Sequence, residues 1–271
     1  MFLPHFFCLR PRILQLIVVV LLLGQLPAAA TVFNWPSPPG WTAGAPAPGQ
    51  TQTQSFTSIN PNDITVSINN NGASGTGGTW QSGYPAINST LLNGGLPGTN
   101  GLQLYLGSQS SVSSYILTTV SFASPVTNLS FQLWDVDSSS PYIDTITQIQ
   151  ALAYGGGVIG ATSVTSAVPG YNTITGTGLS TVVTGIATAS NTTNEGTINI
   201  SFNAPITEFS FRWLNTDSSL GSQGVGLGPL TYTVVPVPEP STSSLLGAGL
   251  MFGVIFQFLR RRKRLIQTSR S

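Results

Sequence analysis

The central part of this 271-residue sequence predicts an all-β fold, an antiparallel β-sandwich of the jelly-roll kind. Short runs rich in Val, Ile, Thr and aromatic residues are separated by clusters of Gly, Asn, Pro and Ser, which is typical of strands joined by turns. No segment of this part keeps the 3.6-residue period of an amphipathic helix. Thr and Ser occupy most of the polar positions, as expected for pleated surfaces that are exposed on one side.

The individual strands can be placed from their residue pattern. Residues 64–68 alternate with a period of two and end in an Asn-Asn-Asn-Gly cluster that predicts a turn. Residues 145–154 and 158–164 are joined by three glycines, which predicts a hairpin. The remaining strands are expected at residues 102–106, 115–122, 181–187, 197–202, 208–214 and 230–235.

The N-terminal residues 1–30 have the layout of a secretory signal peptide. Two arginines precede an apolar stretch, and the small residues Ala28 and Ala30 mark a cleavage site before Thr31. Residues 31–55 then form a lead-in whose many prolines predict irregular, extended chain. We expect the aromatic residues Phe33, Trp35 and Trp41 to pin this lead-in onto the β-sandwich domain, which spans residues 56–236.

An internal repeat lies within this domain, because residues 122–140 recur at residues 202–220. Each copy contains the end of a strand, a turn marked by a proline and a second strand. Two interpretations are open. Either the copies are equivalent hairpins of one sandwich, or they mark two related small domains. We favour one sandwich, because each unit of about eighty residues would have a thin core on its own. In each copy three alternating apolar residues are expected to face one side: Leu129, Phe131 and Leu133 in the first, Phe209, Phe211 and Trp213 in the second.

The C-terminal residues 237–266 have three components in a fixed order. The triplet Pro238, Glu239 and Pro240 comes first, and an apolar stretch over residues 245–259 follows it. This stretch predicts a short transmembrane helix of about 22 Å. The positive-inside bias holds the basic cluster after it on the cytoplasmic side and leaves the residues before the triplet outside. That cluster consists of Arg260, Arg261, Arg262, Lys263 and Arg264.

This order of triplet, apolar helix and basic cluster resembles the PEP-CTERM sorting signal of Gram-negative bacteria. The resemblance implies that an exosortase, a membrane-embedded enzyme similar to cysteine transpeptidases, recognises the triplet and cleaves near it. The helix would then be a transient membrane anchor of an exported precursor, and the mature protein would reside at the cell surface or in the extracellular matrix. The alternative is an ordinary tail anchor behind a proline-rich stalk. The repeat also resembles the β-rich ectodomains that often precede such tails, which supports the fold and export more than any activity.

The distribution of charge excludes several classes of function. Between residues 31 and 237 there are seven acidic residues and a single base, Arg212, which gives a net charge of −6, although the whole chain carries +1. Nucleic-acid binding needs a basic surface, so we exclude it. Cys8 and His5 are the only residues of their kinds and both lie in the signal peptide. The mature chain therefore has no disulfide, no Ser-His-Asp triad and no histidine-ligated zinc site.

Three aspartates are the main candidates for a site. Asp135 and Asp137 lie two positions apart at the end of a predicted strand, and Asp144 follows seven residues later. Such carboxylates, together with loop carbonyls, could bind calcium. The favoured alternative is that they accept backbone N–H bonds in tight turns. A pair of carboxylates could also serve as the acid and base of a glycoside hydrolase, but only their presence supports this.

Two further residues are candidate ligand contacts. Arg212 either forms an ion pair across the sheet, which we favour, or holds a carboxylate or an acidic sugar. Trp134 lies beside a polar loop, where it could offer a platform to a sugar or pack in the core or at its rim. Together these features predict a non-catalytic, structural or adhesive protein of the cell surface or of the extracellular polysaccharide of a biofilm. The alternatives are a calcium-assisted carbohydrate-binding (lectin-like) module and, less favoured, a glycoside hydrolase.

Overall fold

The computed structural model describes residues 29–36, 40–60, 63–72, 79–109, 114–139, 142–217 and 221–236. The chain divides into two compact units, residues 1–235 and 236–271, and the described residues lie almost entirely in the first. They form seventeen β-strands and one short 3-10 helix, and every strand pair among them is antiparallel. The predicted all-β antiparallel fold is therefore confirmed. The predicted signal peptide up to residue 28 and the predicted C-terminal helix lie outside the described residues.

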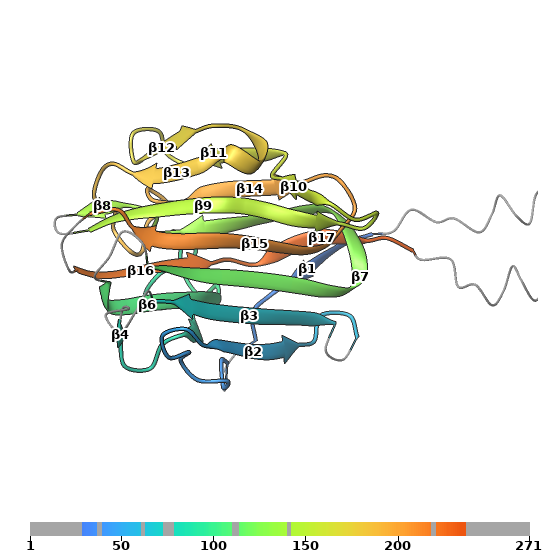
Figure 1. Cartoon of the computed structure of the whole chain (residues 1–271), viewed down its shortest axis with the longest axis horizontal. Helices are drawn as coiled ribbons and strands as arrows, with labels where there is room; N and C mark the ends of the chain where they lie inside the picture. The colour runs from blue at the N-terminus through green and yellow to red at the C-terminus, as the bar shows by residue number, and fades with distance from the viewer. Residues whose placement is uncertain are drawn as a thin grey trace, which may run out of the picture. The chain divides into compact units, whose positions relative to one another are not determined.

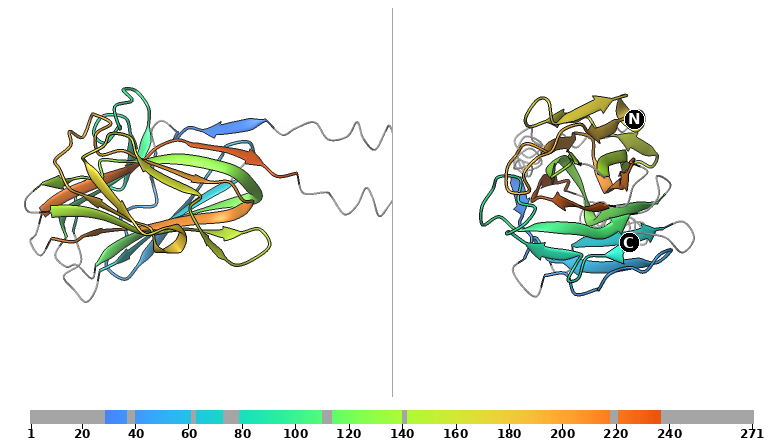
Figure 2. Two further views of the ribbon diagram at one scale, coloured as in Figure 1. Left: turned by 90° about the horizontal axis from the view of Figure 1, so that it is seen from above. Right: turned by 90° about the vertical axis from the view of Figure 1, so that its left-hand side faces the viewer.

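The strands lie in two layers, and one long strand, β7 (Tyr115–Trp134), contributes a half to each (Figures 1 and 2). The first half of β7 pairs with β3 and β15, and the second half pairs with β14, β16 and β17. The first layer contains β2 (Thr51–Phe56), β3 (Ile64–Asn71), β15 (Ile206–Asn215), β9 (Tyr142–Ala153), β8 (Ser138–Ser139), β10 (Val158–Gly160), β13 (Val182–Gly185) and β12 (Asn172–Thr175). The second contains β11 (Ser163–Ser166), β14 (Ile198–Phe202), β16 (Gly221–Leu227), β17 (Leu230–Val234), β6 (Gly101–Gln109), β1 (Ala30–Phe33), β4 (Thr79–Trp80) and β5 (Ala86–Asn88).

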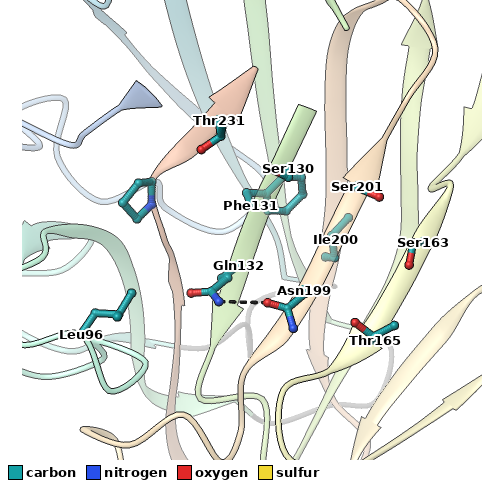
Figure 3. A pocket seen from close by; sticks show the side chains of 11 residues that line it. Leu96, Ser130, Phe131, Gln132, Ser163, Thr165, Asn199, Ile200, Ser201 and Thr231 are labelled. Carbon is teal, nitrogen blue, oxygen red and sulfur yellow. Dashed lines mark hydrogen bonds between the residues drawn. The ribbon is translucent and has the colours of Figure 1, made fainter. Parts of the chain in front are cut away.

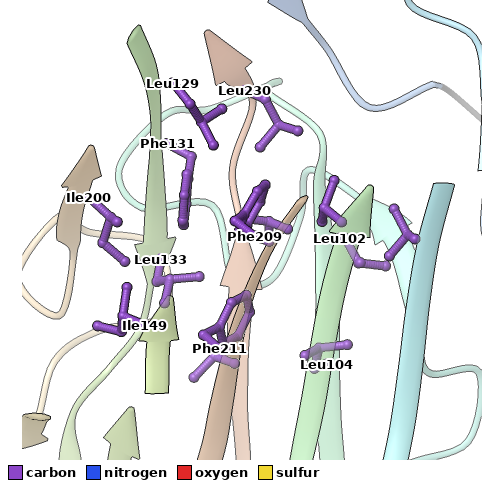
Figure 4. Close-up of a cluster of buried hydrophobic side chains, with 14 of the residues drawn as sticks. Leu102, Leu104, Leu129, Phe131, Leu133, Ile149, Ile200, Phe209, Phe211 and Leu230 are labelled. Atoms are coloured by element: carbon purple, nitrogen blue, oxygen red, sulfur yellow. The ribbon is translucent and has the colours of Figure 1, made fainter. Parts of the chain in front are cut away.

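The core lies between the layers and is built on the two copies of the repeat. The three apolar residues predicted to face one side in each copy, six in all, are buried, which confirms that prediction. The rings of Phe131 and Phe209 stack across the core with their centroids 4.4 Å apart and an interplanar angle of 24°. Figure 4 shows this pair among other buried side chains, which come from β6, β7, β9, β14, β15 and β17. The alternation of buried and exposed residues along β7 and β14 follows the period of two that the sequence has.

The two copies of the repeat are interlocked. In each copy the strand before the proline pairs with the strand after the proline of the other copy: the first half of β7 pairs with β15, and β14 pairs with the second half of β7. Each copy therefore supplies one strand to each layer, and the segments at Pro125 and Pro205 carry the chain between layers. Because the apolar face of each copy is covered by the other, the two copies share one core.

The lead-in differs from its prediction in one respect and agrees in another. It was expected to be irregular, but residues 30–33 form β1 and residues 51–55 belong to β2, so that expectation is wrong there. Their backbone groups find partners in β17 and β3, which are distant in sequence. The expected anchoring is confirmed, because Phe33, Trp35 and Trp41 are buried, and the rings of Phe33 and Trp35 meet edge to face at 5.0 Å.

Other strand boundaries also differ from expectation. The Asn cluster at residues 69–71 is not a turn but continues β3, because its backbone pairs with residues 115–117 of β7. The side chains of Asn69 and Asn70 donate to Thr51 Oγ1 (2.8 Å) and to the carbonyl of Pro46 (3.2 Å). The strand expected at residues 158–164 is divided into β10, which pairs with β9, and β11, which pairs with β14 in the other layer. The glycine hairpin is confirmed by hydrogen bonds between Ala153 and residues 156 and 157.

Replacing Phe131 with Ala should lower the free energy of unfolding by about 3–5 kcal/mol, because the change removes a buried ring and leaves a cavity beside Phe209. Denaturant unfolding followed by tryptophan fluorescence measures this. Leu152→Ala is the control: this side chain is 41% exposed, so its loss should change the stability by only about 0.5 kcal/mol. Equal effects of both substitutions would contradict the role given to the Phe131–Phe209 pair.

Candidate functional site

The three candidate aspartates come together where β7 ends and β9 begins. Asp135 and Asp137 follow the last residue of β7, and Asp144 is the third residue of β9. The exposed fractions of their side chains are 7%, 2% and 0%. Asp144 and Asp137 are tied by two hydrogen bonds, because the Asp144 N–H donates to the Asp137 carbonyl (2.9 Å) and the Asp137 N–H donates to Asp144 Oδ2 (3.4 Å). The site is thus a buried cluster of carboxylates.

Two of the three carboxylates accept hydrogen bonds that fasten distant segments. Asp137 Oδ2 accepts from the Ala189 N–H at 2.8 Å, and Asp144 Oδ1 accepts from the indole Nε1–H of Trp213 at 2.8 Å. In the second copy of the repeat, Asn215 lies at the position of Asp135, and its Oδ1 accepts from the Ile143 N–H at 2.9 Å. These carboxylates and this amide satisfy backbone and indole donors far away in the sequence, whereas the turn interpretation placed the donors within local turns.

The electrostatics of the cluster favour bound protons. Burial, together with the charge of Asp137, raises the pKa of Asp135 to about 8. Burial also raises the pKa of Asp137 and of Asp144, although hydrogen bonds from Ala189 and Trp213 oppose the rise. Asp135 Oδ1 and Asp137 Oδ1 are buried and have no hydrogen-bond partner among the described residues. Near neutral pH the cluster therefore binds protons that free carboxylates would have lost.

The geometry of the cluster bears on the calcium hypothesis. Within the described ranges, no group of three or more His, Cys, Asp or Glu side chains is arranged to hold a metal ion. The structure therefore gives Asp135, Asp137 and Asp144 no cage of three carboxylates. The side chains of Asp137 and Asp144 are directed instead to the Ala189 N–H and the Trp213 indole.

Trp134 lies inside the protein, where its ring does not face solvent. It is 0% exposed, and four glycines surround the indole. A Cβ atom added at Gly94 or at Gly101 would lie 2.2 Å from the ring, so only glycine fits at these positions. The indole Nε1–H donates to Gln132 Oε1 at 3.1 Å. The structure thus buries Trp134 among these glycines, apart from the main hydrophobic cluster.

Arg212 lies on the outer face of β15, where its partner is an aromatic ring. The guanidinium carbon is 4.1 Å from the centroid of the Tyr115 ring, which is cation–π geometry. An ion pair across the sheet was expected, but the contact shown within the described part of the chain is this stacking. Nε of Arg212 is buried and has no hydrogen-bond partner there.

Most residues of the predicted sorting and cleavage signals lie outside the part of the chain that the structure describes. Ala28, the triplet from Pro238 to Pro240 and the basic cluster from Arg260 to Arg264 lie outside the described residues. Ala30 is described as the first residue of β1 and is the register partner of Thr233 in β17. Within the described ranges, no helix has both the length and the apolar character that a membrane crossing requires.

Comparisons with known proteins identify the C-terminal signal. The family described as the PEP-CTERM protein-sorting motif matches residues 236–263. The chain therefore carries this motif, which confirms the prediction made from the triplet, the apolar stretch and the basic cluster. The motif indicates an exported, membrane-anchored precursor that an exosortase processes. No curated protein matches the sequence.

Among solved structures, the chain has a weak likeness to carbohydrate-binding modules of Clostridium thermocellum. One is a family 11 module in complex with a β-1,3-1,4-mixed-linked tetrasaccharide, at 12% identity and a TM-score of 0.31, covering 78% of this chain and 98% of that chain. Another is the family 11 module of a cellulosomal cellulase, also at 12% identity and a TM-score of 0.31, covering 79% and 100% of the two chains. TM-scores this low do not carry an argument about this chain.

The aspartates were predicted from the sequence, but most of their partners were not. Ala189 is 52 residues from Asp137, and Trp213 is 69 residues from Asp144. One of these partners could have been expected from the repeat. Trp213 occupies the position that Leu133 has in the first copy, and the N–H of a buried indole needs a hydrogen-bond acceptor. Tyr142, whose pKa is raised by burial and by the three aspartates, also joins the cluster.

The cluster predicts a pH dependence of stability. The pKa of Asp135 is about 8 in the folded chain and near 3.8 in the unfolded chain. Between these two pH values the folded chain therefore holds a proton that the unfolded chain has lost. The free energy of unfolding should therefore fall as the pH rises, by up to roughly 4 kcal/mol between about pH 5 and about pH 8. Asp135→Asn, which stays neutral, should remove much of this slope and stabilise the protein at pH 8. Asn is suited to the positive φ of 62° at this residue.

Asp63→Asn serves as the control of opposite sign. Burial by itself raises the pKa of Asp63, but N–H donors from Asn60, Ser58 and Ile59 outweigh it and lower the pKa. The contribution of Asp63 is therefore present at neutral pH and lost as the pH falls, so that Asp63→Asn should destabilise the protein at pH 7. Chemical denaturation across pH measures both variants. A parent protein whose stability does not decline toward pH 8 would refute the assignment for Asp135.

Proposed function

We propose that the protein is an exported, exosortase-processed component of the cell surface or of the extracellular polysaccharide matrix, with a structural or adhesive role and no catalytic activity. The observation that carries this proposal is the PEP-CTERM motif at residues 236–263, which begins two residues after the last strand of the β-domain ends at Val234. The motif accounts for export and for processing by an exosortase. The β-domain, which ends just before the motif, is the part that remains after processing.

The placement of the chain ends supports processing at both termini. β1 begins at Ala30 and pairs with β17 along its whole length, from the pair Ala30–Thr233 to the pair Phe33–Leu230. The predicted signal-peptide cleavage site and the sorting motif thus adjoin two neighbouring strands at the same end of the domain. Cleavage before Thr31 would remove only Ala30 from β1, and a cut near Pro238 lies beyond β17. Both strands would stay in the sheet, because Phe33, Leu230 and Tyr232 are buried in the core.

The available side chains support a role without catalysis. Residues 31–237 contain no Cys, His or Lys, which removes thiol nucleophiles and the imidazole and amine bases that activate serine or threonine hydroxyls. The cluster of Asp135, Asp137 and Asp144 is buried, and two of its members accept hydrogen bonds that join segments of the fold. A glycoside hydrolase would need carboxylates that reach a bound sugar, and these side chains are directed inward.

The proposal predicts the mass of the mature protein. In a host that has an exosortase, the exported protein should end near Pro238 and lack the cluster from Arg260 to Arg264. Replacing Pro238, Glu239 and Pro240 together with Ala should leave the C-terminal tail uncleaved and retain the protein in the membrane. Intact-mass spectrometry of the membrane and released fractions measures both outcomes.

The matched control is the double substitution of Ser241 and Thr242 with Ala, which alters neighbouring residues and keeps the triplet. This variant should be processed like the parent protein. Exported material that still contains Arg260 to Arg264 in the parent strain would contradict the proposal, as would normal processing of the variant without the triplet.

A further inference from the structure

A groove of about 350 Å³ lies on the outer face of the second layer, on the side of the sheet that faces away from the core (Figure 3). Its floor is formed by β14 and the second half of β7, and β11 and β17 border the floor on either side. Leu96, from the loop between β5 and β6, and Pro229, between β16 and β17, stand at its margin. The volume falls within the range of small-molecule binding sites, which begins at about 300 Å³.

The strand register arranges the polar side chains of the groove in two rows. One row contains hydroxyls and runs across all four strands, because Ser163 pairs with Ser201, Ser201 with Ser130, and Ser130 with Thr231. Four strands at a spacing of about 4.8 Å make this row roughly 14 Å long. The second row lies two residues further along the strands and contains Thr165, Asn199 and Gln132.

The two amides of the second row have a fixed orientation. Trp134, enclosed by its four glycines, donates its indole Nε1–H to Gln132 Oε1 at 3.1 Å. Gln132 Nε2 therefore points the other way and donates to Asn199 Oδ1 at 2.9 Å (Figure 3). This chain of bonds leaves the Nδ2 group of Asn199 as a donor toward the groove. Through Gln132, the buried Trp134 thus determines which end of the Asn199 amide is left as a donor.

The chemistry of the lining restricts the ligand. None of the residues that line the groove is charged, although the exported part of the chain carries a net charge of −6. Hydroxyl groups donate and accept at once, and the Asn199 amide adds a fixed donor, so the floor suits a ligand that also presents donors and acceptors in close succession. Leu96, which is 43% exposed, adds an apolar contact at the margin.

We propose that this groove binds a segment of a neutral polysaccharide, with its sugar hydroxyls on the two polar rows and Leu96 against a C–H face of a sugar ring. The site requires no metal ion, since its ligand is held by hydroxyl and amide groups. The inference deepens the adhesive role proposed above and rests on it for its biological setting. The groove lies within the β-domain, however, so its binding can be measured whether or not the tail is cleaved.

The experiment uses the full chain purified in detergent and titrated calorimetrically with defined polysaccharides. Dextran, galactomannan and hydroxyethylcellulose are the neutral probes, and alginate and hyaluronate are the acidic ones. We expect saturable binding of at least one neutral probe, unchanged by a calcium chelator, and no binding of the acidic probes.

Asn199→Asp tests the amide directly. Its carboxylate can still accept the hydrogen bond from Gln132 Nε2, but the Nδ2 donor is lost and a negative charge enters the groove. Binding of the neutral probe should weaken at least tenfold. Ser130→Leu, on the exposed floor, is a second variant that obstructs the hydroxyl row and should weaken binding to a similar degree.

Asn88→Asp is the matched control, since Asn88 also uses its Oδ1 as an acceptor, from the Thr90 N–H at 3.2 Å, and is not part of the groove. It should bind like the parent protein. Three results would overturn the inference: no saturable binding of any neutral probe, binding of acidic probes alone, or neutral binding that both groove variants leave unchanged. None of these results alters the mass of the mature protein, so failure of this inference and failure of the sorting proposal are distinguishable.

Discussion

The contact between Phe131 and Phe209 across the core is the interaction on which the rest of the structure depends. The two residues come from different copies of the repeat, Phe131 from the first and Phe209 from the second, and their stacked rings join the two layers. Each copy passes from one layer to the other, so each apolar face is covered by the other copy and neither can be buried alone. In a chain without disulfides, burial in this shared core and the antiparallel ladder must supply the stability.

The interlocking of the copies also explains the cluster of buried carboxylates. Where β7 leaves the sheet, Asp137 accepts a hydrogen bond from the Ala189 N–H, and Asp144 accepts one from the Trp213 indole. Ala189 follows β13 and Trp213 belongs to β15, and both strands pair with β9. Charged carboxylates in this environment would repel one another, and burial shifts the balance toward their protonated forms. Perturbed pKa values are often a sign of catalysis, but here the same residues serve as hydrogen-bond acceptors in the frame of the fold.

Sorting and binding are assigned to different parts of the chain. The sorting motif follows β17 directly, and β17 with β1 forms the end at which both signals adjoin the domain. The groove depends on β11, β14, β7 and β17 and on the buried Trp134, which orients Gln132 and Asn199. The glycines around Trp134 are needed because the indole occupies the space of their missing side chains. A residue first considered as an exposed sugar platform thus contributes from the interior, by fixing an amide at the surface.

The sequence by itself determined the all-β fold, the repeat with its buried alternating residues, the anchoring aromatics of the lead-in and the sorting motif. These features are written in local patterns: a period of two, a proline after a strand, and a triplet before an apolar stretch. Only the tertiary structure decided that β7 serves both layers, that the lead-in supplies β1 and β2, and that Asp144 meets Trp213. It also decided that Ser130, Ser201, Ser163 and Thr231 form one row. The reason is that strand register is set by contacts between residues far apart in the chain, and a shift of one residue would turn every one of these side chains to the other face.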